Sequence, residues 1–251
     1  MRPSQVHRIA GHEPTYTPKK GIPTVIIVLL AINVIIYAVR FVLPAGLHEG
    51  LIRFFAVVPG RVASTDPDNI MALGHELLTF ITHAFLHGDF GHIGFNCLWL
   101  LVFGTMMASR FRVETASGLI VFLSFYLTAA VFCGIVFVFA SLGENVLLIG
   151  ASGALSALMA GGVRIGFKRF AHLGPMPAPP LPILDRRVVG VSLVYILLNL
   201  SLVTPLGGLV FMTDQPGNVA WEVHIAGFLF GLVTMPFFDS LAGNATRRGM
   251  L

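Results

Sequence analysis

Six stretches of roughly 20 mostly apolar residues follow one another along this chain, and each is long enough for a helix to cross a bilayer. Only 11% of the 251 residues are charged, against about 25% in soluble domains, so polar side chains cannot cover a globule of this size. The composition excludes a soluble enzyme, a disordered chain and a nucleic-acid-binding protein as leading interpretations. It predicts an integral, multi-pass membrane protein whose spans cover residues 23–43, 86–107, 117–142, 146–165, 188–212 and 219–238.

The positions of the basic residues predict how these spans are oriented. With the N-terminus in the cytoplasm, all of the 16 lysine and arginine residues except Arg40, Arg53 and Arg61 fall on the cytoplasmic side. The positive-inside rule then places both termini in the cytoplasm, and the second, fourth and sixth spans all run from outside to inside. The expected fold class is an all-α, six-transmembrane-helix bundle.

One domain accounts for most of the chain. We expect a short cytoplasmic N-terminal segment over residues 1–22, the six-helix domain over 23–240 and a cytoplasmic tail over 241–251. The N-terminal segment contains no transit-like stretch, which favours a bacterial inner membrane over an organelle membrane.

Polar residues interrupt three of the spans, and such residues are costly in lipid and usually functional. They lie in 'HAFLHGDFGHIGFN' entering the second span, 'GASGALSA' opening the fourth and 'EVHIAGFLFG' in the sixth. Ser152 lies about six residues into the fourth span and His224 about five into the sixth, which places both on the order of 8–10 Å below the outer helix ends. His87, His92 and Asn96 begin the second span at comparable depth. We therefore expect these residues to share one water-accessible cavity near the external face.

Small residues indicate that the fourth and sixth spans approach closely. On the fourth span they recur every four positions from Ser152 to Ala160, and on the sixth Gly227 and Gly231 form a GxxxG motif on the same face as His224. Small residues let membrane helices pack at short distance. If the two faces meet, a serine hydroxyl comes within hydrogen-bonding reach of an imidazole, which is the minimum arrangement for nucleophilic catalysis.

Each of these residues also has a structural interpretation. Ser152 can serve as a small packing residue, His224 as a hydrogen bond between helices, and Asn96 as another. The histidines of the second span can lie in the headgroup region.

Metal binding is a further alternative. The 'HELLT' segment at residues 75–79 is a near miss of the H-E-x-x-H zinc motif, with Thr79 in the place of the second histidine. His83, His87 and His92 form another possible ligand set, but only Asp89 adds a carboxylate close to them.

Three motifs in a fixed order, 'HAFLHGDFGHIGFN', 'GASGALSALMAG' and 'EVHIAGFLFG' on alternate spans, closely resemble those of the rhomboid intramembrane serine proteases. The resemblance covers nearly the whole chain after about residue 22. It implies a serine endopeptidase that cleaves transmembrane protein substrates near the external membrane face, without a metal or a cofactor. The bilayer and these substrates are the expected partners, and nucleic acid is not.

The resemblance also assigns roles to individual residues. The resemblance matches Ser152 to the nucleophile and His224 to the general base of a Ser-His dyad. The other matching positions are His87, His92 and Asn96 at the oxyanion hole, Gly150 in the backbone before the nucleophile, and Gly153, Gly227 and Gly231 in helix packing near the site.

The chain departs from the usual rhomboid pattern at several positions. Leu78 and Thr79 replace a Trp-Arg pair of the first loop, and Ala108 replaces a glutamate at the end of the second span, although Arg110 is kept. Ser156 stands where some members have an aromatic ring against the catalytic histidine.

Two other functions stay open. A rhomboid-like chaperone that binds transmembrane helices would normally lack the serine or the histidine. A transporter would carry polar residues across the full bilayer, whereas here only Asn33 and Asn199 lie away from the cluster, and we interpret both as interhelical hydrogen bonds.

Overall fold

The computed structural model describes residues 21–167, 179–202, 204 and 220–244, and within these ranges the chain forms helices and connecting segments without a β-strand. A helix satisfies its own backbone hydrogen bonds, which is required of a chain segment in lipid. In chain order the elements are α1 (Thr24–Ala38), η1 (Val39–Phe41), α2 (Ala45–Phe55), α3 (Pro59–Ser64), α4 (Ile70–Thr82), η2 (His83–Phe85), α5 (Phe90–Trp99), η3 (Leu100–Gly104), α6 (Thr105–Phe111), α7 (Ala116–Ala140), α8 (Ser152–Arg164), α9 (Arg186–Ser201), α11 (Trp221–Asp239) and η5 (Ser240–Asn244).

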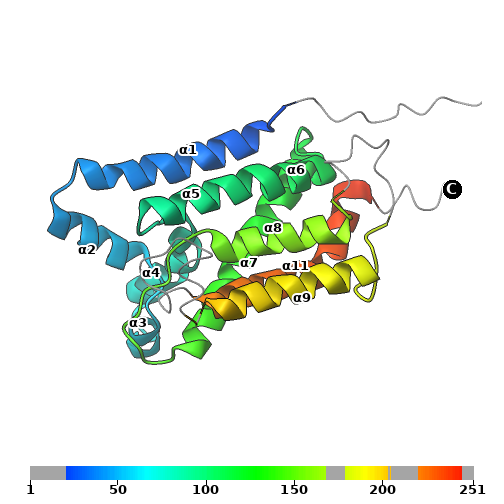
Figure 1. The fold of residues 1–251 in the computed structure, drawn as a ribbon. Helices are drawn as coiled ribbons and strands as arrows, with labels where there is room; N and C mark the ends of the chain where they lie inside the picture. Colours follow the sequence, from blue (N-terminus) through cyan, green and yellow to red (C-terminus); the bar gives the residue numbers. More distant parts are fainter. Residues whose placement is uncertain (1–20, 168–178, 203, 205–219, 245–251) are drawn as a thin grey trace, which may run out of the picture.

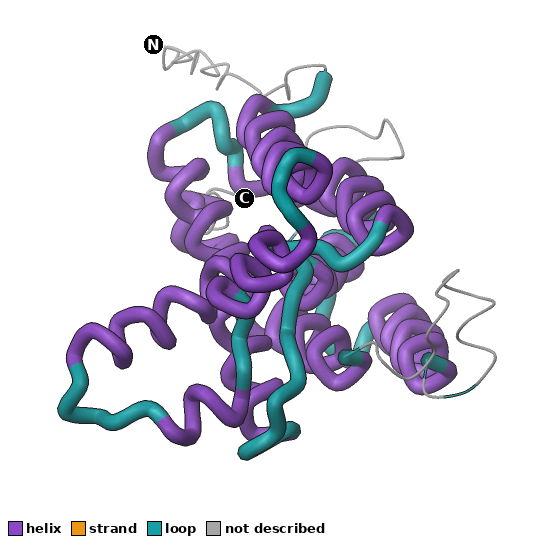
Figure 2. The backbone as a smooth tube through the Cα atoms, turned by 90° about the vertical axis from the view of Figure 1, so that its left-hand side faces the viewer, coloured by secondary structure: helices purple, strands orange, loops and turns teal. Residues whose placement is uncertain are grey.

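The long helices run side by side, with α2, α3 and α4 gathered at one end of the bundle (Figure 1). Figure 2 views this end, so that several long helices are seen end-on. Among the described residues, four helical segments are long and apolar enough to cross a membrane, and they match the first, second, third and sixth predicted spans. These segments are Thr24–Phe41, Phe90–Phe111, Ala116–Ala140 and Trp221–Gly243.

The fourth and fifth predicted spans correspond to the shorter helices α8 and α9, of 13 and 16 residues. Both lie along the long helices in Figure 1. The part of the fifth span at residues 205–212, the segment 1–20 and the tail 245–251 lie outside the described residues.

The start of the fourth span differs from the prediction. Residues 146–151 are not helical, and Leu148 forms an isolated antiparallel bridge with Val57 of the first loop. Gly150 has φ +113°, a value that interrupts any right-handed helix. Helix α8 therefore begins at Ser152, and the expectation that this serine lies about six residues into a helix was wrong.

Helices α8 and α11 touch through their backbones. A Cβ atom on Gly227 would overlap the carbonyl oxygen of Gly153, and one on Gly231 would overlap that of Ala157. The small residues of α8 that contact the α11 backbone are thus Gly153 and Ala157. The predicted stripe runs from Ser152 through Ser156 to Ala160, one position earlier on the helix. Ser156 points to α9 instead.

The far end of α11 is held by a buried ion pair. Arg110 of α6 donates from Nε and Nη2 to the two carboxylate oxygens of Asp239, at 2.6 and 2.7 Å. This bidentate geometry fixes both the distance and the orientation between the two helices. Arg110 thus anchors the helix that carries His224. This arginine is present although Ala108 replaces the glutamate two residues before it.

The backbone contact between α8 and α11 predicts the effect of a single methyl group. Gly231→Ala should lower the free energy of unfolding by about 1–3 kcal/mol, because the added Cβ forces the two helices apart. The matched control is Gly190→Ala on α9, where a Cβ meets no atom within 4 Å. Unfolding in mixed micelles should leave the control unchanged or slightly stabilised, and equal loss in both variants would contradict the close contact.

Candidate active site

Ser152 and His224 meet where α8 and α11 begin. Ser152 is the first residue of α8 and His224 lies in the first turn of α11. The Ser152 Oγ lies 2.8 Å from His224 Nε2, and the other ring nitrogen, Nδ1, lies 2.9 Å from Oδ1 of Asn199 on α9. Three helices therefore contribute one polar side chain each to a continuous chain of hydrogen bonds.

The position of Ser152 at the start of α8 has a chemical consequence. The first N–H groups of a helix have no partner within it, and they carry the positive end of the helix dipole. The first hydrogen bond of the α8 ladder runs from the Leu155 N–H to the Ala151 carbonyl. The Ser152 N–H consequently lies beside its own hydroxyl without being used by the helix. Had the helix begun at residue 146, this donor would have been consumed.

Gly150 gives the backbone before Ser152 its shape. Besides its positive φ, a Cβ there would lie 2.5 Å from His92 Nε2, so the His92 ring packs directly against this glycine. The Gly150 N–H donates to the His83 carbonyl at 2.8 Å, and the His83 ring nitrogen Nε2 bonds the Ala130 carbonyl at 3.3 Å. The loop before Ser152 is thus tied to the segment that leads into α5.

The start of α5 holds the predicted oxyanion residues. Asp89 caps this helix by accepting the His92 N–H at 2.8 Å, so the carboxylate considered above as a metal ligand has a structural partner. The rings of His87 and His92 lie edge to face with centroids 5.0 Å apart. Asn96 donates one amide hydrogen to the His92 carbonyl at 2.7 Å. The structure therefore places His92 beside Gly150 and His87 beside His92, while Asn96 bonds its own helix.

Tyr195 of α9 contacts Ser156, the residue that stands where some rhomboids have an aromatic ring. The Ser156 hydroxyl donates to the Ser152 carbonyl at 2.7 Å, so the Tyr195 hydroxyl donates the 2.6 Å hydrogen bond to Ser156. The Tyr195 ring stacks on Phe228 of α11 with centroids 4.3 Å apart. Reasoning from the sequence missed Tyr195, and the spacing of four between Tyr195 and Asn199, which places both on one face of α9, was the available signal.

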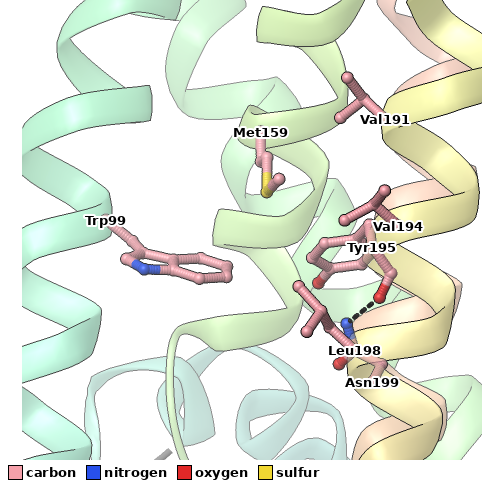
Figure 3. Close-up of a pocket in the computed structure, with 7 residues that line it drawn as sticks. All are labelled: Trp99, Met159, Val191, Val194, Tyr195, Leu198 and Asn199. Atoms are coloured by element: carbon pink, nitrogen blue, oxygen red, sulfur yellow. Dashed lines mark hydrogen bonds between the residues drawn. The ribbon is translucent and has the colours of Figure 1, made fainter. Parts of the chain in front are cut away.

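A mostly apolar pocket of about 200 Å³ lies between α5, α8 and α9. Trp99 forms one side and Met159 of α8 the back, while the face of α9 from Val191 to Asn199 forms the other side (Figure 3). Tyr195 and Asn199, which contact the site residues, also line this pocket.

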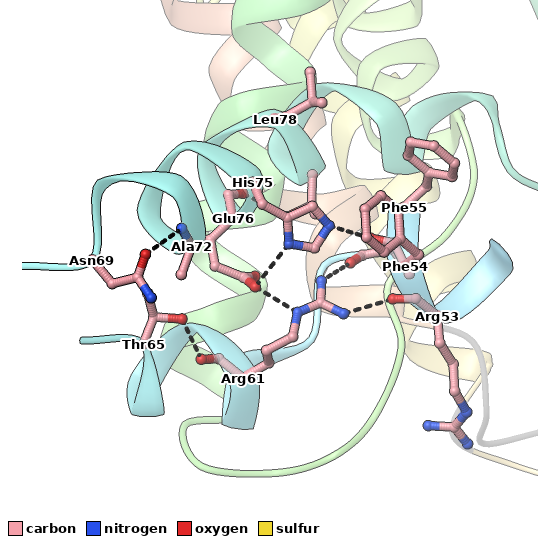
Figure 4. Close-up of polar contacts among 12 residues, drawn as sticks. Arg53, Phe54, Phe55, Arg61, Thr65, Asn69, Ala72, His75, Glu76 and Leu78 are labelled. Atoms are coloured by element: carbon pink, nitrogen blue, oxygen red, sulfur yellow. Dashed lines mark hydrogen bonds and ion pairs between the residues drawn. The ribbon is translucent and has the colours of Figure 1, made fainter. Parts of the chain in front are cut away.

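The first loop is stabilised by Arg61, at a position other than the missing Trp-Arg pair (Figure 4). Its Nε pairs with the Glu76 carboxylate at 2.6 Å, and its two terminal nitrogens donate to the Arg53 and Ala56 carbonyls at 2.6 and 2.8 Å. His75 adds a bond to the Phe54 carbonyl at 2.8 Å. Through α4 and η2, this loop leads directly to His83 and the start of α5.

No metal cluster forms in the part of the chain that the structure describes. No group of three or more His, Cys, Asp and Glu side chains comes together there with ligand geometry. In the 'HELLT' segment, His75 and Glu76 take part in the first-loop network instead.

A family model described as the rhomboid domain matches residues 74–239. The match covers most of the chain and includes every site residue above, so this protein belongs to the rhomboid family and is an integral membrane protein. No curated protein sequence matches the chain.

The Arg61 network predicts that this arginine stabilises the first loop. Arg61→Gln should lower the free energy of unfolding by about 2 kcal/mol, because it leaves the buried Glu76 carboxylate without its cation. Arg53→Gln removes a charge from the same loop but keeps the Arg53 carbonyl, and surface changes of this kind usually stay within about 0.5 kcal/mol. Unfolding in micelles, with proteolysis of residues 45–69 as a local measurement, should separate the two variants. Equal unfolding free energies and equal proteolysis rates in the two variants would show that Arg61 does not stabilise the first loop.

Proposed function

We propose that this protein is an intramembrane serine endopeptidase that cleaves membrane-anchored proteins near the external membrane face. Rhomboid proteins are generally proteases of this kind, although inactive members exist. The 2.8 Å contact between Ser152 Oγ and His224 Nε2 carries the proposal for this chain. An inactive relative has no need to keep a serine and an imidazole in this geometry within a bilayer, where buried polar groups are expensive.

The first half-reaction uses both residues. His224 Nε2 takes the Ser152 hydroxyl proton while Oγ attacks the scissile carbonyl carbon, giving a tetrahedral oxyanion. The carbon–nitrogen bond then breaks, and the imidazolium donates its proton to the leaving amine. The product is an ester between Ser152 and the N-terminal part of the substrate.

The oxyanion needs donors near Ser152. The Ser152 N–H is one, and the side chains of His92, Asn96 and His87 are proposed to supply the others. His92 packs against Gly150 and needs no large movement, and Asn96 has a second amide hydrogen besides the one that bonds its own helix. Each such donor is worth roughly 2.7–4 kcal/mol of barrier in a site that excludes water.

Hydrolysis of the ester completes the cycle. A water molecule attacks the carbonyl with His224 as its base, the Ser152 oxygen leaves and takes that proton back from His224, and the carboxylic acid product departs and loses its remaining acidic proton to water.

The membrane arrangement is part of the same proposal. We propose six spans in a bacterial inner membrane, with both termini in the cytoplasm. This orientation would place Ser152 and His224 toward the external side. By its family, the expected substrate is a transmembrane helix that unwinds at helix-breaking residues and carries a small residue before the cut.

A fluorescent fluorophosphonate, which reacts with activated serines, tests this proposal in micelles. The wild type should be labelled, Ser152→Ala should not, and His224→Ala should react about 10²- to 10⁴-fold more slowly because the general base is gone. Ser192→Ala on α9, whose hydroxyl bonds the Val188 carbonyl of its own helix, is the control and should be labelled. Cleavage of a tagged transmembrane peptide in proteoliposomes should follow the same order and persist in EDTA.

Two results would overturn the proposal. Labelling of Ser152→Ala at the wild-type rate would locate the reactive serine elsewhere. Absence of labelling and cleavage in wild-type protein that unfolds cooperatively would favour the helix-binding chaperone instead.

A further inference from the structure

Asn199 is a buried amide whose side chain bonds His224. It lies near the end of α9 with only 3% of its surface exposed. Its Nδ2 donates to the Tyr195 carbonyl at 2.9 Å, and its Oδ1 lies 2.9 Å from His224 Nδ1. A serine–histidine dyad by itself gives this residue no role.

The hydrogen-bond partners of Asn199 determine how its amide is oriented. A backbone carbonyl accepts and never donates, so the group facing Tyr195 must be the amide nitrogen. The amide oxygen is therefore the group that faces His224, and it accepts the hydrogen bond. It follows that His224 carries its proton on Nδ1.

This assignment leaves the lone pair of Nε2 directed at the Ser152 hydroxyl. A neutral imidazole has one N–H and one bare nitrogen, and only the bare nitrogen can accept the serine proton. The other tautomer would present an N–H to Oγ and could not act as a base. When Nε2 becomes protonated, the Asn199 oxygen still faces Nδ1–H and stabilises the imidazolium.

We propose that Asn199 is a positioning residue that holds His224 in the catalytic tautomer, making a Ser-His-Asn arrangement from α8, α11 and α9. The proposal rests on the serine-hydrolase function above and adds the helix that controls the base. A neutral asparagine serves this purpose in cysteine proteases, in which it orients the histidine. In a bilayer, an amide does so without adding a buried charge.

The surroundings of Asn199 fix its position on α9. One turn earlier, Tyr195 bonds Ser156 of α8 and stacks on Phe228 of α11, so α9 is held against both helices that carry the reacting residues. Tyr195 thereby also fixes the carbonyl that orients the Asn199 amide. The same stretch of α9, from Val191 to Asn199, lines the pocket opposite Trp99 (Figure 3).

Kinetics of three α9 variants test the role. Asn199→Leu keeps the volume but removes the acceptor, and should lower kcat for a transmembrane peptide by about 10²-fold while KM changes less than about twofold, because the tautomer rather than substrate binding is affected. Asn199→Asp keeps an acceptor and should retain kcat within about tenfold. Ser192→Ala, whose hydroxyl bonds only the Val188 carbonyl of its own helix, should match the wild type.

A second measurement does not depend on activity. In ¹⁵N-histidine-labelled wild-type protein at neutral pH, the His224 signals, identified by their loss in His224→Ala, should report a proton on Nδ1 and a bare Nε2. In Asn199→Leu the two tautomers should mix. A wild-type His224 protonated on Nε2 would overturn the proposal even if Asn199→Leu failed to fold.

The outcomes separate this inference from the proposed function. Normal wild-type cleavage with unchanged kcat and tautomer in Asn199→Leu would remove the role of Asn199 and leave the protease standing. An inactive wild type whose tautomer nevertheless depends on Asn199 would support the positioning contact and remove the protease.

Discussion

The close approach of α8 and α11 is the contact on which the site depends. Glycines at 227 and 231 let one helix lie on the carbonyl oxygens of the other, and this brings the first turn of α11 against the start of α8. Ser152 and His224 can then share a short hydrogen bond in a medium where an unpaired imidazole would be expensive. Any bulk between these helices would separate the two side chains, so packing and chemistry cannot be varied independently here.

The surrounding elements each constrain one end of this pair. Arg110 and Asp239 fix the far end of α11, and the Gly150–His83 bond fixes the loop before Ser152. The first loop, held by Arg61 and Glu76, leads into His83 and α5. Where the usual Trp-Arg pair is missing, Arg61 of α3 bonds the Glu76 carboxylate and the carbonyls of Arg53 and Ala56, which ties the segments of this loop together.

Helix α9 links the pocket to the base. Tyr195 and Asn199 of this helix bond α8 and α11, and both also line the apolar pocket opposite Trp99. Because a single helix contacts both, the orientation of His224 depends on where α9 lies. The hydrogen bond between His224 and Asn199 thus links the pocket between α5, α8 and α9 to the reacting atoms.

The sequence by itself determined the membrane class, most span positions and the approach of Ser152 to His224. Apolar length, charge placement and small-residue spacing are local properties, and they act the same way whatever the helices pack against. Tertiary structure decided the start of α8 at Ser152, the stripe through Gly153 and Ala157, and the partners of Arg61, Tyr195 and Asn199. Helix α11 has apolar residues around its whole circumference, so hydrophobic periodicity alone does not say which side meets which neighbour. These features arise from contacts between residues far apart in the chain. The start of α8 also depends on Gly150, whose positive φ prevents the helix from beginning earlier.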